Sequence, residues 1–271
     1  MSRYECKLRP DLLEKAIREL NEPRDNAERL KAIDALRGSF DTNIYGSLIR
    51  SDDGFLLRFL RARKFNLEKA LMVLQNYHTI RKNFREVFSL AEHPHSLKPI
   101  MDTGFMFVVD GKAKGGESVI IYQPNHLSQH VSLYQVVAYG VVCVEELLED
   151  EEFQICGGIT VDDLLQFNKE RMGEVSVIGA KKLSSVWQDA MPVRMRNVYI
   201  FNQGLVMEAI FALFKPFWRN KLMKRIQLHG ENYRALHAEV DPCILPPCFY
   251  GTGLNMKMAA KQWVKRLEKQ W

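Results

Sequence analysis

The segment "SVIIYQP" (residues 118–124) is a short apolar run rich in Val, Ile and Tyr, a composition typical of a buried β-strand. Similar runs are "GFMFVVD" (104–110), "ICGGITVDD" (155–163) and "NVYIFNQ" (197–203). Helical stretches separate the later runs, with residues 132–150 between the second and third and residues 174–190 between the third and fourth. A strand, a long helix and another strand indicate parallel crossover connections. The sequence therefore predicts an α/β region with a mixed, mainly parallel sheet covered by helices.

In the part of the chain before this region, the apolar residues recur at a different spacing. Several stretches carry apolar residues at spacings of three and four, which is typical of amphipathic helices. They are residues 9–20, 23–39, 51–65 and 66–84. Ser51, Asp52 and Asn66 are residue types that cap helix N-termini, so we expect the third and fourth helices to begin there. The sequence thus predicts a helical N-terminal domain (1–93) followed by an α/β domain (94–271).

Charged residues accompany the predicted helices. The third helix carries basic residues off its apolar stripe, and the preferred interpretation is a solvated face or ionic contacts with a neighbouring helix. These residues are Arg58, Arg61, Arg63 and Lys64. The acidic pair Glu145–Glu146 and the run "EDEE" (149–152) are expected at the solvated C-terminus of a helix.

The overall composition is that of an ordinary globular protein. The 271 residues are 46% hydrophobic and 26% charged, with a net charge of +5 and a pI near 8.9. This charge is too mild to indicate nucleic-acid binding, but it is compatible with an anionic surface. The first residues contain no apolar signal segment, and the uncharged apolar stretch at 133–144 is shorter than the roughly 18 residues that a membrane span needs. We therefore expect a cytoplasmic protein that does not span a membrane.

The sequence contains no recognisable catalytic or metal-binding motif. Its five cysteines show no paired C-x-x-C spacing, which favours reduced thiols over disulfides or a metal site. The segment "GKAKGGES" (111–118) has Glu117 where a phosphate-binding loop requires Lys, so a hairpin turn is the better interpretation. There is no G-x-S-x-G sequence, and Asp162 and Asp163 are expected at a strand end. The chain is therefore predicted to be no enzyme and to use no metal or other cofactor.

Two adjoining segments combine a very apolar surface with a cluster of positive charge. The segment "GLVMEAIFALFKPF" (204–217) has more apolar surface than one surface helix needs. The overlapping segment "KPFWRNKLMKRIQLHG" (215–230) is predicted to be an amphipathic helix with Lys221, Lys224 and Arg225 in one arc. A core helix followed by a solvated one is one interpretation. The other is a lid, which covers an apolar ligand in one state and enters a membrane interface in another.

Four blocks of sequence, taken together, resemble one protein family. They are "DDGFLLRFLRARKFNLEKAL" (52–71), "MPVRMRNVYIFNQG" (191–204), "KPFWRNKLMKRIQLHG" (215–230) and "ILPPCFYGTG" (244–253). In their order and spacing they resemble the CRAL-TRIO family of lipid carriers, over roughly residues 50–255. Within that family the chain is most similar to the branch of the alpha-tocopherol transfer protein, cellular retinaldehyde-binding protein and the clavesins.

The resemblance implies an N-terminal helical bundle and a CRAL-TRIO lipid-binding domain, whose sheet floors a hydrophobic pocket closed by a mobile lid helix at about 204–215. The pocket residues expected from it are Tyr122, Val137, Gly140, Val144, Ile159, Val186, Trp187, Met191 and Tyr199. The lid residues expected are Leu205, Met207, Ile210, Phe211 and Phe214. A bound hydrophobic ligand is expected in this pocket.

The resemblance also implies a phosphoinositide-binding groove beside the lid. The family positions match Arg194, Arg196, Lys221 and Arg225, with Lys224 next to them. The spacings agree with this role. Residues two apart at a strand start point to one face, and residues four apart lie one helical turn from each other.

The function implied is that of a carrier for a small hydrophobic ligand, such as a retinoid, a tocopherol or a similar isoprenoid. It would dock on phosphoinositide-containing membranes for ligand exchange and associate peripherally with endomembranes. Its expected partners are the lipophilic ligand, phosphatidylinositol phosphates and the membrane surface, with no nucleic acid. A phospholipid exchange protein and a phosphoinositide-binding trafficking adaptor are the alternatives.

Overall fold

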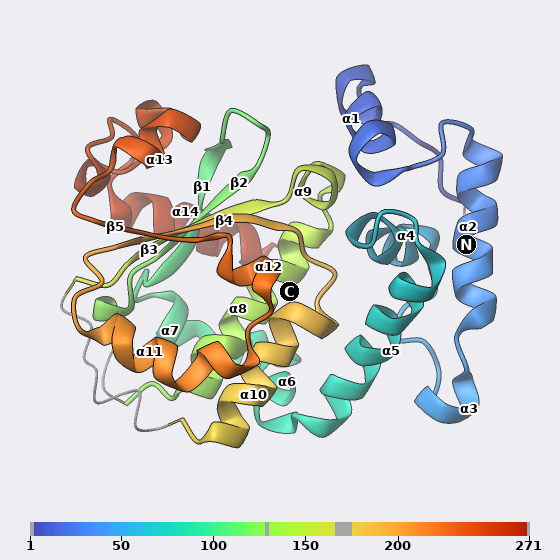
Figure 1. The fold of residues 1–271 in the computed structure, drawn as a ribbon, viewed down its shortest axis with the longest axis horizontal. Coiled ribbons are helices and arrows are strands. Elements are labelled where there is room, and N and C mark those ends of the chain that lie inside the picture. The colour runs from blue at the N-terminus through green and yellow to red at the C-terminus, as the bar shows by residue number, and fades with distance from the viewer. Residues whose placement is uncertain (1–2, 128–129, 166–174, 270–271) are drawn as a thin grey trace.

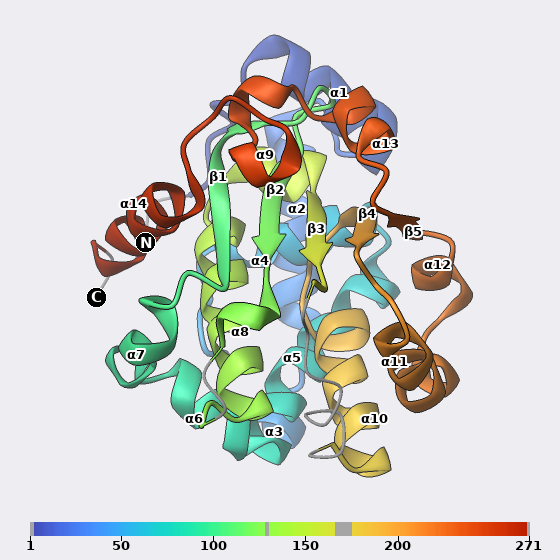
Figure 2. The ribbon, with the colours of Figure 1, turned by 90° about the vertical axis from the view of Figure 1, so that its left-hand side faces the viewer.

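A five-stranded sheet forms the centre of the α/β region. The computed structural model describes residues 3–127, 130–165 and 175–269. The strands, in the order in which they lie side by side, are β1 (Met106–Lys112), β2 (Ser118–Tyr122), β3 (Gly158–Asp163), β4 (Met195–Phe201) and β5 (Ile226–Gly230). β1 and β2 are antiparallel, and the remaining neighbours are parallel (Figure 2). The predicted mixed, mainly parallel sheet is therefore confirmed.

Helices precede the sheet and connect its strands. Those before the sheet are α1 (Pro10–Leu20), α2 (Asn26–Ser39), α3 (Thr42–Tyr45), α4 (Asp53–Ala62), α5 (Leu67–Asn83), α6 (Arg85–Ala91) and α7 (Lys98–Met101). Those after its first hairpin are α8 (Leu133–Leu148), α9 (Glu151–Cys156), α10 (Val177–Ser185), α11 (Val206–Phe214), α12 (Asn220–Met223), α13 (Arg234–Glu239) and α14 (Met256–Glu268). Figure 1 shows α1–α5 on one side of the molecule and the sheet on the other. None of the described helices is long and apolar enough to cross a bilayer.

Local signals in the sequence place several element ends. The Asp52 carboxylate accepts the backbone N–H of Phe55 and caps α4, and the Asn66 side chain caps α5. Ser51 precedes the first of these caps and does not itself cap the helix. The Gly-rich segment 111–118 joins the antiparallel strands β1 and β2, as predicted for a hairpin turn. The predicted helix at 174–190 begins at Val177 in the structure, and position 174 lies outside the described residues.

Buried arginines join the N-terminal helices to the α/β region. Arg61 on α4 is fully buried and donates hydrogen bonds to Glu22 at 2.8 and 2.9 Å and to Gln154 of α9 at 2.8 Å. Arg29 of α2 donates to the same Glu22 at 2.8 Å. Because both guanidinium groups share a buried carboxylate, α2, α4 and α9 are held in one arrangement. The solvated face predicted for Arg61 is therefore wrong, and the ionic contact is correct.

A second set of ion pairs connects α4 with α8. Arg58 is 1% exposed and donates to Glu145 at 3.1 Å and to Glu149 at 2.7 Å. Arg81 of α5 donates to Glu145 at 2.6 Å. The acidic groups predicted to be solvated at the end of α8 are thus partners of arginines on α4 and α5. Glu145 and Glu149 keep contact with solvent, as predicted, whereas Arg58 is buried, which the sequence periodicity did not show.

Residues 215–230 differ from the single amphipathic helix that was predicted. They form a 3-10 turn at Lys215–Phe217, the short helix α12 and the strand β5. β5 lies parallel to β4, with Val198 N–H donating to the Arg225 carbonyl and Asn202 N–H donating to the Gly230 carbonyl, both at 2.9 Å. β5 is the edge strand of the sheet, and its pairing with β4 hydrogen-bonds one side of its backbone and overrides the helical period. The predicted helix is therefore wrong over its second half.

Candidate functional site

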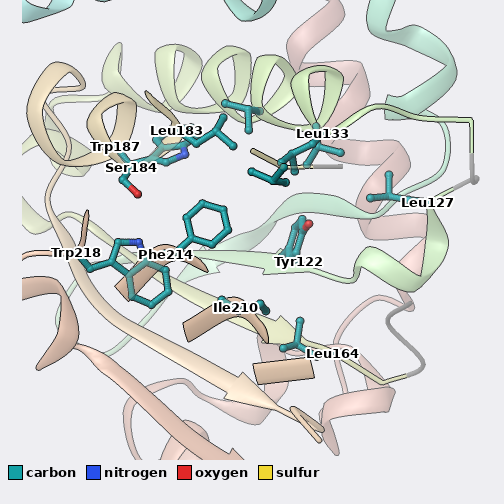
Figure 3. Close-up of a pocket in the computed structure, with 13 residues that line it drawn as sticks. Tyr122, Leu127, Leu133, Leu164, Leu183, Ser184, Trp187, Ile210, Phe214 and Trp218 are labelled. Carbon is teal, nitrogen blue, oxygen red and sulfur yellow. The ribbon is translucent and has the colours of Figure 1, made fainter. Parts of the chain in front are cut away.

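A cavity lies between the sheet and the helices α8, α10 and α11. One chamber of about 260 Å³ is almost entirely apolar, and Figure 3 shows its lining. The lining residues are Tyr122, Leu127, Leu133, Val136, Val137, Leu164, Val175, Leu183, Ser184, Trp187, Ile210, Phe214 and Trp218. In Figure 3 the rings of Phe214 and Tyr122 lie between Leu183 and Leu133 on one side and Ile210 and Leu164 on the other. A largely apolar cavity of this kind suits a lipophilic molecule.

A second chamber of about 300 Å³ adjoins the first and extends beneath α11 and α12. The two chambers share the lining residues Tyr122, Leu164, Ser184, Trp187, Ile210 and Trp218. The second is lined in addition by Asp162, Gln188, Val198, Ile200, Met207, Leu222 and Ile226. Together the chambers reach the roughly 300–1,000 Å³ that is usual for small-molecule sites.

The register of the sheet decides which residues reach this cavity. Tyr122, Asp162 and Ile200 are paired across β2, β3 and β4, so their side chains share the face that floors the chambers. Ile159 and Tyr199 occupy alternate positions on the same strands and point to the opposite face. There the ring of Tyr199 stacks on His229 with the ring centroids 5.4 Å apart. Ile159 and Tyr199 therefore do not line the cavity, and their prediction as pocket residues is wrong.

The helices contribute some of the other predicted pocket residues. Val137 and Trp187 line the cavity. Gly140 lies against Trp187, because a β-carbon at Gly140 would be 3.2 Å from the indole ring. The absence of a side chain at this position lets the ring approach α8. The remaining predicted residues, Val144, Val186 and Met191, are buried in the hydrophobic core and are not among the residues described as lining either chamber.

The predicted lid segment forms the helix α11. Met207, Ile210 and Phe214 line the cavity. Phe211 instead packs edge-on against Trp218, with 5.9 Å between the ring centroids. Leu205, just before the helix, is 73% exposed. One side of α11 therefore covers the cavity, while an apolar residue at its start faces solvent.

Three polar side chains that line the cavity, those of Asp162, Ser184 and Gln188, were missed by the sequence interpretation. Asp162, expected only as a strand-end residue, lines the second chamber, and burial raises the pKa of its carboxyl to about 7. Ser184 lines both chambers and is 6% exposed. The alternation along β3 shows that Asp162 and Asp163 point to opposite faces. The sequence alone does not reveal which of them faces the cavity.

Arg194 and Arg196 meet a carboxylate of the first helix. Arg196 Nη2 donates to Glu19 Oε2 at 2.7 Å, and Arg194 Nη2 lies 3.6 Å from the same oxygen. Burial and, after it, the charge of Arg196 lower the pKa of Arg194 to about 10. Arg194 Nη1 is buried and has no hydrogen-bond partner among the residues that the structure describes. The pair therefore retains a donor that an added anion can satisfy.

Lys221 and Arg225 extend this positive region. Burial lowers the pKa of Lys221, and so do the charges of Arg225, Arg63, Lys64 and Arg194. Burial and the charge of Arg196 lower the pKa of Arg225. A cation lowers the pKa of another basic group only when the two lie close together. The lowered pKa values therefore indicate that these side chains are neighbours. We call Arg63, Arg194, Arg196, Lys221 and Arg225 the basic cluster, and its arrangement is suited to a polyanion.

Arg63 belongs to this cluster although the sequence interpretation placed it with the other charged residues of its helix. It follows α4 directly, and burial followed by the charge of Arg219 lowers its pKa. Its position off the apolar stripe was the signal available in the sequence. Lys224, by contrast, is exposed at the end of α12 and forms no ion pair within the described ranges. The structure thus brings together four of the five predicted cations and adds Arg63.

Comparisons with known proteins agree with this fold. The family model for the CRAL/TRIO domain matches residues 102–251, and that for the CRAL/TRIO N-terminal domain matches residues 32–76. "Alpha-tocopherol transfer protein-like" of Homo sapiens is 32% identical over 257 residues, covering 94% of this chain and 74% of that protein. "Clavesin-1" of Rattus norvegicus is 32% identical over 255 residues, covering 93% and 71%. The crystal structure of Sfh5 is similar in fold, with a TM-score of 0.56 at 16% identity, and the match covers 98% of this chain and 99% of that one.

The helical N-terminal part, the mixed sheet and the apolar cavity define a lipid-binding protein of the α/β class. The chain belongs to the CRAL/TRIO family, because the domain model matches more than half of its residues and its relatives match along most of its length. The family resemblance predicted from the four sequence blocks is therefore confirmed, including its branch. Proteins of this family are carriers of lipophilic ligands and not enzymes.

Proposed function

We propose that this protein carries a small hydrophobic ligand, of the size of a retinoid or a tocopherol, and exchanges it at phosphoinositide-containing membranes. One observation supports both halves of the proposal. Leu222 and Ile226 line the second chamber, while Lys221 and Arg225, each adjacent to one of them, belong to the basic cluster. A membrane that binds these cations therefore lies directly over the cavity wall.

The chemistry of each part fits its role. Transfer of an apolar ligand from water into the cavity is favourable by about 25 cal/mol for each Å² of apolar surface buried. Each Lys or Arg near an anionic leaflet contributes on the order of 1 kcal/mol, so the basic cluster supports reversible docking and not permanent anchoring. The exposed Leu205 and the apolar α11 provide side chains that enter the interface once the cations have bound.

The carrier function is tested by identifying what the protein binds. Mass spectrometry of the organic extract of protein purified from its native cells is the first measurement, followed by titration with retinol and α-tocopherol monitored by tryptophan fluorescence. A stoichiometric isoprenoid and saturable quenching support the carrier. A stoichiometric phospholipid favours the exchange protein instead. A cavity that no lipophile fills favours the trafficking adaptor.

Filling the cavity is expected to reduce ligand uptake. Val137→Trp places an indole ring where the ligand lies, and a ligand that displaces it meets the cost of about 1–3 kcal/mol that is usual for overpacking. Retinol is therefore expected to bind roughly 10- to 100-fold more weakly. Met72→Trp adds the same ring at a position on α5 that is 57% exposed, and it serves as the control. Equal affinity of both variants for retinol would count against the cavity as the ligand site.

Glu19 is expected to compete with the membrane for the basic cluster. Burial opposes the ionisation of Glu19, but the hydrogen bond and charge of Arg196 outweigh it and lower the pKa of Glu19. Glu19→Gln removes this internal counter-ion, so binding to vesicles that contain phosphatidylinositol bisphosphate should strengthen by about 5-fold, the effect of one charge near the surface. Glu14→Gln removes an exposed charge from the same helix and is the matched control. An equal gain in both variants would show that net charge alone is responsible.

A further inference from the structure

The two edges of the sheet differ in how they are protected. At the β1 edge α14 lies beside the strand (Figure 2), and Gln262 Nε2 donates to Asp110 Oδ2 at 3.3 Å. β5 forms the other edge, and none of its residues is buried. Edge strands are commonly kept from pairing by a proline, a charged side chain or a covering element. The β5 sequence "IQLHG" (226–230) contains no proline and no Lys, Arg, Asp or Glu, so it lacks the first two of these protections.

The backbone of β5 has hydrogen-bonding groups that point away from the sheet. In a parallel ladder, alternate residues of the edge strand bond to the neighbouring strand. The Val198 N–H donates to the Arg225 carbonyl at 2.9 Å, and Gln227 is the next residue in this alternation. Ile226 and Leu228 therefore direct their N–H and C=O groups outward, and no other described residue forms a hydrogen bond with those groups. Each of the two residues can pair with one further strand.

The charges that flank β5 indicate which strand fits it. Lys224 and Arg225 directly precede the strand, and Glu231 directly follows it. None of the three forms an ion pair within the described ranges. Antiparallel pairing of two identical strands places the basic start of each beside the acidic end of the other, whereas parallel pairing places like charges together. Leu228, at the centre of the strand, is 45% exposed and meets its own counterpart. β5 is thus self-complementary, as a two-fold interface requires.

We propose that β5 pairs antiparallel with β5 of a second copy of this chain, with Leu228 on the two-fold axis. The Leu228 N–H of each copy donates to the Leu228 carbonyl of the other, and Ile226 lies opposite Gly230. The two sheets then form one continuous sheet. Because the two-fold axis of an antiparallel pair is perpendicular to the sheet, both cavities lie on the same side of it. This dimer goes beyond the proposed carrier function and does not depend on it.

Sedimentation equilibrium of the full chain tests the dimer. The pairing uses one short strand, so we expect reversible association with a Kd on the order of 10–100 µM, as for small interfaces. The average mass should rise with concentration from the monomer value of 31.4 kDa toward twice that value. A mass that stays at the monomer value up to about 500 µM would overturn the proposal.

A substitution on the two-fold axis tests the backbone bonds. Leu228→Pro removes the outward N–H but no bond to β4, and a proline is tolerated on an edge strand at such a position. Association should weaken roughly 10- to 100-fold, because both reciprocal bonds are lost. The thermal unfolding transition shows whether the variant remains folded. An unchanged Kd in a folded Leu228→Pro protein would overturn the pairing.

An exchange of the flanking charges tests the register without altering the strand. Glu231→Lys places a cation beside Lys224 and Arg225 of the other copy, so the dimer should weaken about 10-fold. Adding Lys224→Glu and Arg225→Glu inverts all of these charges, and the Kd should return to within about 3-fold of that of the unchanged protein. Glu86→Lys makes the same change at an exposed site on α6 and should have no effect. Weakening by Glu231→Lys that the added substitutions do not reverse would overturn the antiparallel register.

Discussion

A protein with Lys221→Glu and Arg225→Glu is expected to bind vesicles that contain phosphatidylinositol bisphosphate roughly 1,000-fold more weakly than the unchanged protein. Two positive charges are removed and two negative charges are added, a change of four units at about 1 kcal/mol each. Both side chains are partly exposed, so the protein is expected to tolerate the substitutions. Co-sedimentation with vesicles of phosphatidylcholine, with and without the phosphoinositide, measures the effect.

The control is a charge change of equal size in a different place. Lys257→Glu with Lys261→Glu alters two exposed residues one helical turn apart on α14. Figure 2 shows α14 beside the β1 edge of the sheet and α12 beside the β5 edge. This control should lose much less vesicle affinity, and both variants should still take up retinol in solution. A similar loss in both would mean that the basic cluster has no special role in docking.

Arg61→Ala is expected to lower the free energy of unfolding by about 3–5 kcal/mol, the usual effect of removing one partner of a buried ionic network. The substitution leaves Glu22, which is 1% exposed, with Arg29 as its remaining cation and removes a donor from Gln154. Urea unfolding measures the change as a shift of the midpoint at constant slope. A large change in slope would instead indicate that the N-terminal helices and the sheet unfold separately.

The comparison for this prediction is an arginine outside the network. Arg85 is exposed, and its ion pair is with Glu92, also exposed, at 3.1 Å. Surface pairs of this kind contribute about 0–1 kcal/mol, so Arg85→Ala should leave the midpoint nearly unchanged. If Arg61→Ala is as mild as Arg85→Ala, the buried network does not hold α4 to α9, and the N-terminal helices must be held by apolar packing alone.

Local patterns in the sequence were sufficient for most of the fold. The caps at Asp52 and Asn66, the alternation of strands with helices and the glycine turn at 111–118 each depend on residues close together in the chain. β5 was missed because the helical spacing of Lys221 and Arg225 continued into a segment whose hydrogen bonds come from β4. The spacing of residues within one segment contains no information about pairing with a strand elsewhere in the chain.

The candidate site was predicted less completely than the fold. Val137, Trp187, Ile210 and Phe214 were placed at the cavity from the family resemblance, and the structure puts them there. Tyr199 was misplaced because alternate residues of a strand point to opposite faces of the sheet. The resemblance did not specify which residues of β4 point toward the cavity. For the same reason Asp162 was not recognised as a cavity residue.

The sequence by itself determined most of the elements, the family and four cations of the basic cluster, because spacing and residue type are local properties of the chain. Only the tertiary structure decided which face of β3 carries Asp162, which arginines are buried, and that Glu19 meets Arg196 across 177 positions. These outcomes depend on the register of neighbouring strands and on the docking of helices far apart in the chain. Such contacts fix the burial, the pKa and the partner of each side chain, and so they decide what each residue does.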